Sequence, residues 1–204
     1  MSIGLARTYR KVARLARNAV IDLRYGGFLG GTTTSSHLLR GSYETVNSDY
    51  AVLSQILPPV LRPDDVVVDV GCGRGRVINW MLHRGYRNRI IGIEINPAIA
   101  EQTRRRLHRH PNVEIRCGNA IDCLPPEASL YYLFNPFDRM LMSQFRDRLL
   151  ALGGSARLLY YAPTCLEVFE AEPRFRVTRG EVDVGHLSRS ELRHRRFALI
   201  ERLT

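Results

Sequence analysis

The stretch at residues 66–77 constrains the fold more than any other part of the chain. It reads Val-Val-Val-Asp-Val-Gly-Cys-Gly-Arg-Gly-Arg-Val. Four valines around one aspartate indicate a strand buried on both faces, which is typical of a parallel sheet. Three alternate glycines follow, and residues 77–82 then predict a helix. A strand, a glycine turn and a helix bring backbone close to a nucleotide-like ligand, because glycine has no Cβ.

An acidic residue near the end of the next expected strand, residues 89–95, supports this interpretation. Glu94 lies about twenty residues beyond the glycines, where a carboxylate that binds ribose hydroxyls is expected. The glycine spacing is not the dinucleotide form G-x-G-x-x-G, because position 76 is arginine. No phosphate-binding lysine follows the glycines either, so the pattern favours a ligand without phosphate at this loop.

Asp-x-Gly-x-Gly-x-Gly followed by a ribose acid resembles motif I and its partner in class I S-adenosylmethionine-dependent methyltransferases. The resemblance covers about residues 43–204 and implies an enzyme that takes a methyl group from S-adenosylmethionine, its cofactor. The implied fold is α/β and Rossmann-like, with about seven mostly parallel strands, helices on both faces and an antiparallel last strand. The cofactor-binding residues that it implies are Tyr43, Thr45, Asp69, Gly71, Cys72, Gly73, Gly75, Arg76, Glu94, Ile95, Asn119, Ala120 and Asn135.

A narrower likeness rests on the segment before the glycine motif. Tyr43-Glu44-Thr45, a helix at residues 51–57 and then the glycines are similar to the layout of nucleosomal histone lysine methyltransferases of the non-SET, telomeric-silencing type. In that family the Tyr/Glu/Thr loop closes over the methionine end of the cofactor. Further along, Asn119 is expected to accept a hydrogen bond from the adenine amine, with Asp122 as the alternative.

Residues 130–134 predict the fourth strand, and Asn135-Pro136-Phe137 follows it. Ligands of open α/β sheets bind at the carboxyl ends of the strands, so we expect Asn135 to face the methyl group. The triplet resembles the Asn-Pro-Pro-Phe/Tyr motif of amino-methyltransferases, with one proline fewer. It implies that Asn135 Oδ1 or the Pro136 carbonyl aims an amine lone pair, while Phe137 and Tyr43 line the sulfonium. A turn that merely ends the strand is the alternative.

The acceptor is therefore expected to be a nitrogen of a protein or a nucleic acid. The alternative is a small molecule or a lipid-like metabolite, methylated on nitrogen or oxygen. An oxygen acceptor needs a general base, for which Asp138 and His186 are the candidates. A non-catalytic subunit that retains the fold and binds the cofactor is a third hypothesis.

Residues 1–50 are expected to form an N-terminal helix and a lid or loop, and residues 51–204 the catalytic domain. In the helix predicted at 3–25, apolar residues recur at spacings of three and four, with arginines on the other side. The apolar members are Leu5, Tyr9, Val12, Ala16, Ala19 and Leu23. The helix is expected to pack on its own domain or form a homodimer; an anionic membrane surface and nucleic acid phosphates are the alternatives.

The formal net charge of +10 favours an anionic partner, namely nucleic acid, an acidic protein or a membrane surface. Lys11 is the only lysine, so a general preference for arginine is the alternative explanation. The four cysteines have neither C-x-x-C nor metal-ligand spacing, and we expect no metal site. No apolar run approaches the ~20 residues of a membrane span. Without a secretory signal pattern, the expected location is the cytoplasm.

Overall fold

A computed structural model describes residues 3–29, 47–183 and 194–203 of the chain. Tyr43, Glu44, Thr45 and His186 lie outside the described residues. Seven strands form one sheet in the order β3-β2-β1-β4-β5-β7-β6. They are β1 (Val66–Val70), β2 (Arg89–Glu94), β3 (Val113–Cys117), β4 (Leu130–Phe134), β5 (Arg157–Tyr161), β6 (Phe175–Glu181) and β7 (Arg196–Arg202).

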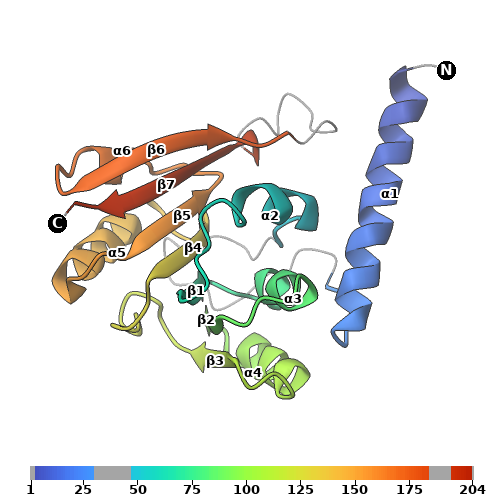
Figure 1. The fold of residues 1–204 in the computed structure, drawn as a ribbon, viewed down its shortest axis with the longest axis horizontal. Coiled ribbons are helices and arrows are strands. Elements are labelled where there is room, and N and C mark those ends of the chain that lie inside the picture. Colours follow the sequence, from blue (N-terminus) through green and yellow to red (C-terminus); the bar gives the residue numbers. More distant parts are fainter. Residues whose placement is uncertain (1–2, 30–46, 184–193, 204) are drawn as a thin grey trace.

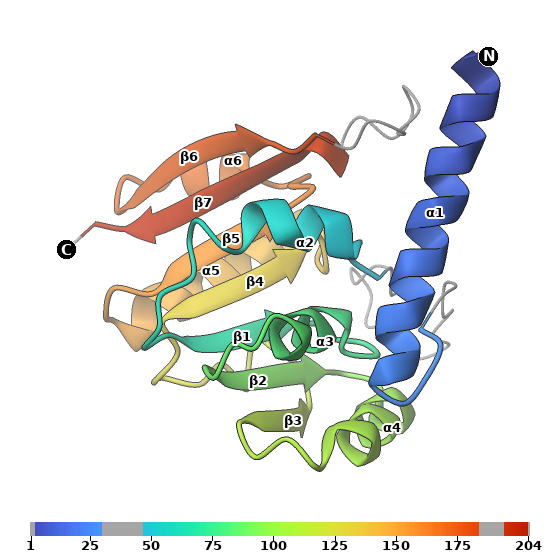
Figure 2. The same cartoon turned by 45° about the vertical axis from the view of Figure 1, so that its right-hand side comes forward.

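Helices cover both faces of this sheet (Figures 1 and 2). One face carries α2 (Tyr50–Ile56), α3 (Arg76–His83) and α4 (Pro97–Leu107), and the other carries α5 (Arg139–Leu152) and α6 (Glu167–Glu170). α1 (Ile3–Arg24) stands beside α3. The α/β Rossmann-like fold predicted from the sequence is confirmed.

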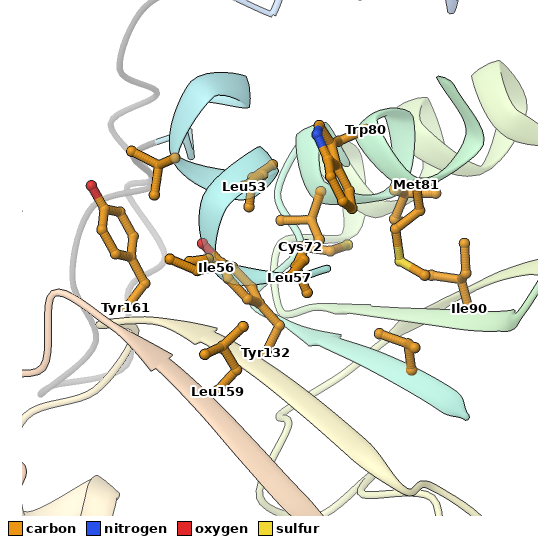
Figure 3. Packing of buried hydrophobic residues seen from close by; sticks show 14 of the residues in the cluster. Leu53, Ile56, Leu57, Cys72, Trp80, Met81, Ile90, Tyr132, Leu159 and Tyr161 are labelled. Atoms are coloured by element: carbon orange, nitrogen blue, oxygen red, sulfur yellow. The ribbon is translucent and has the colours of Figure 1, made fainter. Parts of the chain in front are cut away.

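The alternation of side chains along β1 explains why this strand needs apolar residues on both sides. Val67 packs into the core beneath α2 and α3, whereas Val68 and Val70 pack into the core beneath α5. Figure 3 shows the first of these cores, in which Trp80 of α3 and Leu53 of α2 lie above Tyr132 of β4. Burying side chains of this size stabilises each by about 1.5–3 kcal/mol.

The parallel and antiparallel pairings decide which edge of the sheet can bind a ligand. β1 pairs in parallel with β2 and β4, and β4 pairs in parallel with β5. β7 is inserted between β5 and β6 and runs antiparallel to both, which confirms the antiparallel closing strand. The carboxyl ends of β1, β2, β4 and β5 therefore meet at one edge of the sheet, where ligands of open α/β sheets bind.

The orientation of α1 contradicts one expectation from its sequence. Packing of its apolar face on its own domain was one of the two expected arrangements, but Tyr9, Val12, Val20 and Leu23 are all exposed. The buried residues Asn18, Ile21 and Asp22 lie on the other side of the helix. In both views the N-terminal half of α1 extends away from the helices that cover the sheet (Figures 1 and 2). No helix among the described residues is long and apolar enough to span a membrane.

Candidate active site

The loop that joins β1 to α3 has the conformation that its glycines predict. Gly71, Gly73 and Gly75 have φ values of 72°, 52° and 74°, in the left-handed region that glycine adopts without a steric penalty. The Gly75 amide donates to the Cys72 carbonyl at 2.7 Å, and the Thr103 hydroxyl of α4 donates to the Gly73 carbonyl at 2.9 Å. These bonds hold the loop backbone in one conformation.

Glu94 lies directly beside this loop at the end of β2. Its Oε2 accepts a hydrogen bond from the Gly73 amide at 2.9 Å, and its Oε1 accepts one from the Asn96 amide at 2.8 Å. Burial raises the pKa of Glu94, while these amide donors act in the opposite direction. Each carboxylate oxygen has a second lone pair, so the same group can accept from a pair of ribose hydroxyls.

Asp69 provides the test of whether the site fits S-adenosylmethionine. Its side chain is buried, and Oδ2 has no hydrogen-bond partner among the described residues. Burial, and then the charge of Glu94, raise the pKa of Asp69 to about 8. A buried acceptor without a donor is costly. The ammonium group of S-adenosylmethionine is the kind of donor that this oxygen lacks, so the residues present fit the cofactor.

Two of the residues expected to bind the cofactor use their side chains elsewhere. The Cys72 thiol is buried against the sheet, where a Cβ on Gly92 would lie 2.8 Å from its Sγ. The Arg76 guanidinium donates to Asp22 of α1, with Nη2 to Oδ2 at 2.6 Å. Arg76 therefore anchors α1 through its side chain. Only the backbone of either residue remains for the cofactor.

The loop after β3 contains the expected adenine contact. Asn119 Oδ1 accepts from the Ile121 amide at 3.1 Å, and its Nδ2 donates to Asp122 at 2.8 Å. A carbonyl oxygen has a second lone pair, which leaves Asn119 able to accept from an adenine amine. Ala120 packs in the core on the α5 side, and Ile95 is half-buried next to Glu94.

Asn135 is held at the carboxyl end of β4 in an uncommon backbone conformation. Its φ is 45°, and the φ of Ala162, which follows the adjacent strand β5, is 49°. Asn135 Oδ1 accepts hydrogen bonds from the Tyr160 hydroxyl at 3.0 Å and from the Thr164 hydroxyl. Strain of about 1–3 kcal/mol per residue in such conformations is concentrated at functional sites. Here the two strained residues follow the neighbouring strands β4 and β5.

Pro136 and Phe137 have different surroundings. A Cβ on Gly71 would lie 3.5 Å from the Pro136 Cβ, so Pro136 borders the glycine loop. Phe137 is buried in the core beneath the sheet, with its ring 5.6 Å from that of Phe145. Phe137 therefore contributes to packing, and its expected place beside the sulfonium stays a prediction.

The structure also places side chains here that sequence reasoning missed. Tyr160 and Thr164 hold Asn135, and Thr103 holds the glycine loop. The ring of His194 lies 5.7 Å from that of Phe134 at the end of β4. Tyr160 could have been predicted from the sequence, because β5 follows β4 in a parallel sheet. Thr103, Thr164 and His194 have no sequence pattern that would predict their positions. No cluster of three metal-ligating side chains occurs among the described residues.

Comparison with known proteins agrees with this geometry. A family model described as a methyltransferase domain matches residues 67–159. Ribosomal RNA small subunit methyltransferase A of Thermotoga petrophila is 28% identical over 152 residues, 65% of this chain and 58% of that protein. The enzyme of the same name from Thermotoga neapolitana is 41% identical over 56 residues, 28% of this chain and 21% of that protein. The chain thus spans less than two thirds of the length of these relatives.

Solved structures share the fold at lower identity. An RNA methyltransferase from Salinibacter ruber, in complex with S-adenosyl-L-homocysteine, has a TM-score of 0.55 and 20% identity, covering 78% of this chain and 93% of its own. A methyltransferase from Pyrococcus furiosus has a TM-score of 0.62 and 15% identity, covering 94% and 97%. The mitomycin 7-O-methyltransferase has a TM-score of 0.58 and 16% identity, covering 76% and 53%.

A methyltransferase domain is therefore matched over residues 67–159, which contain the glycine loop and Glu94, and the fold is that of solved methyltransferases. S-adenosylmethionine is this protein's cofactor. The narrower likeness to histone lysine methyltransferases is not supported: the proteins named above are RNA or small-molecule methyltransferases, or are named without an acceptor. The segment that suggested it lies outside the described residues.

Proposed function

We propose that this protein transfers the methyl group of S-adenosylmethionine to a nitrogen of a macromolecule, with RNA as the first candidate and protein as the second. The observation that carries this proposal is Asn135, fixed in a left-handed conformation at the carboxyl end of β4 with Pro136 against the glycine loop. The net charge of +10 agrees with a polyanionic substrate. The relatives named as RNA methyltransferases agree with it too.

S-adenosylmethionine supplies an activated methyl group when it is bound, so the protein has mainly to orient the acceptor and exclude water. A neutral amine needs hydrogen-bond acceptors that direct its lone pair. Both hydroxyls on Asn135 can donate or accept, so turning the amide by 180° keeps both bonds and frees Oδ1 for the acceptor. The Pro136 carbonyl is the second acceptor in this arrangement.

A small-molecule acceptor is the second candidate, and His194 is the observation that favours it. Its imidazole lies beside Phe134 and Tyr161, at the ends of the strands that carry the proposed acceptor site. An alcohol acceptor requires a general base, and imidazole is the most common one. Asp138, expected as a candidate base, instead caps α5 by accepting from the Leu141 amide at 2.9 Å.

The test combines methyl-tritiated S-adenosylmethionine with a cell lysate and compares the wild type with Asn135→Gly and His194→Gln. Products are separated by nuclease, protease and organic extraction. The proposal expects label in RNA or protein that Asn135→Gly loses and His194→Gln keeps. Label confined to extractable small molecules and lost in His194→Gln would establish the second candidate. Cofactor binding without any Asn135-dependent label would refute transfer to either acceptor.

A further inference from the structure

The exposed apolar surface of this protein is concentrated on one helix. Side chains along one side of α1 are exposed by 51% to 75%, and Phe28, just beyond the helix, by 62%. We call this set the apolar stripe: Tyr9, Val12, Leu15, Val20, Leu23 and Phe28. Elsewhere in the described chain only Met140 and Leu203 are large, apolar and exposed. A contiguous exposed patch of this kind marks an interaction surface.

Polar contacts of α1 keep the apolar stripe turned outward. Asp22 is fully buried and accepts from Arg76, from the Tyr50 hydroxyl at 2.6 Å and from the Leu29 amide at 3.3 Å. Farther along the same side, Arg14 forms an ion pair of 2.8 Å with Asp49. Several bonds thus compensate the desolvation of the Asp22 charge. The helix could not turn its stripe inward without breaking them.

The charges of α1 indicate what covers the stripe. Asp22, neutralised by Arg76, is the only acid in the helix sequence, against six basic residues, Arg7, Arg10, Lys11, Arg14, Arg17 and Arg24. Arg17 and Arg24 are exposed and lie three and four residues from Val20, so they flank the stripe on one side. Apolar residues beside arginines are the pattern of a helix that lies in the interface of an anionic bilayer.

A cationic cavity continues this surface at the end of α1. It has a volume of about 790 Å³ and lies between the segment after α1 and the end of α4. Arg24 and Phe28 of the α1 side line it, opposite Arg105 and Arg109, and no acidic residue contributes to its wall. Such a cavity suits the phosphate of a lipid headgroup, because guanidinium groups bind phosphate through paired hydrogen bonds.

We propose that α1 docks this protein on an anionic lipid membrane, with the apolar stripe among the acyl chains and the arginines at the headgroups. A second copy of the chain fits less well, because pairing two stripes would bring two sets of arginines together. RNA fits less well too, because only Tyr9 and Phe28 of the six stripe residues have an aromatic face on which a base could stack. This proposal does not depend on the identity of the methyl acceptor.

The test is flotation of the purified full-length protein with vesicles of phosphatidylcholine alone or mixed with phosphatidylglycerol. The protein should float with the mixed vesicles at low salt and be released at high salt. Val12→Glu and Val20→Glu should each weaken this binding by about tenfold or more, because each replaces a valine proposed to lie among the acyl chains with a charge. Met140→Glu, an equally exposed apolar position at the start of α5, should bind as the wild type does.

Charge variants form a second arm that does not alter the stripe. Arg17→Gln together with Arg24→Gln should weaken binding to mixed vesicles, whereas Arg84→Gln with Arg87→Gln, at the opposite edge of the sheet, should not. No flotation of the wild type with mixed vesicles would overturn the proposal. So would a dimer in sedimentation that Val20→Glu splits, or binding to an RNA oligonucleotide that survives while vesicle binding is absent.

Discussion

Replacing Asp69 with asparagine should change how the stability of the cofactor-free protein depends on pH. Burial and Glu94 raise the pKa of Asp69 from 3.8 to about 8 in the folded chain. Between these two values the folded state binds a proton that the unfolded state releases. The free energy of unfolding therefore falls as the pH rises through this window, and the contribution of Asp69 is fully favourable only below it.

The size of the effect follows from the width of the window. Each pH unit inside it changes the free energy of unfolding by about 1.4 kcal/mol. From pH 5 to pH 7, Asp69 should therefore lower the stability of the wild type by about 2.7 kcal/mol. Asparagine does not titrate, so the stability of Asp69→Asn relative to the wild type should rise by the same amount over these two units.

Urea unfolding followed by circular dichroism, at several pH values between 5 and 9, measures this difference directly. The subtraction removes the contributions of the histidines and other groups that both proteins share. The difference should grow up to about pH 8 and then level off. If the free energies of unfolding of wild type and variant differ by a constant amount over the whole pH range, Asp69 does not titrate with a raised pKa in the folded protein, and the reasoning is refuted.

Other substitutions test the loop, the acceptor end and the anchor of α1. Gly73→Val should abolish binding of S-adenosylhomocysteine in calorimetry, whereas Gly85→Val, at another left-handed glycine with open space around it, should keep it; equal affinities would misplace the site. Asn135→Gly keeps the left-handed backbone and should bind cofactor but lose at least about 100-fold in methyl-transfer rate, because the acceptor amine loses the Oδ1 that orients its lone pair; full activity would disprove its role. Arg76→Met leaves the buried Asp22 without its counter-charge, and should cost about 3–5 kcal/mol in urea unfolding; a loss below about 1 kcal/mol would show that the pair does not anchor α1.

The sequence was sufficient for the sheet and the cofactor loop because both depend on local patterns. Valines on both sides of Asp69 require a strand covered on two faces, and Gly71, Gly73 and Gly75 occupy positions where the backbone has positive φ. Glu94 follows from its distance along the chain. In each case the residues that carry the signal are the ones that form the structure.

The surroundings of α1 and Asn135 could not be predicted in the same way, because they depend on contacts between distant segments. The spacing of apolar residues in α1 is typical of a face that packs inward. Asp22 instead bonds to Arg76 and Tyr50 of other elements, which turns the polar side of α1 toward the domain and the apolar side outward. Phe137 likewise follows Asn135, the proposed acceptor-site residue, but it is buried in the core on the α5 side, near Phe145.

Calorimetry of S-adenosylhomocysteine binding to the wild type, Glu94→Gln and Glu101→Gln tests the cofactor site itself. Glu94 holds the glycine loop and faces the proposed ribose site, whereas Glu101 pairs with exposed arginines on α4. We expect one site in the wild type, with affinity unchanged in Glu101→Gln and weakened by about tenfold or more in Glu94→Gln, since a charge-assisted pair of hydrogen bonds is lost. No binding by the wild type, or equal affinity in both variants, would contradict it.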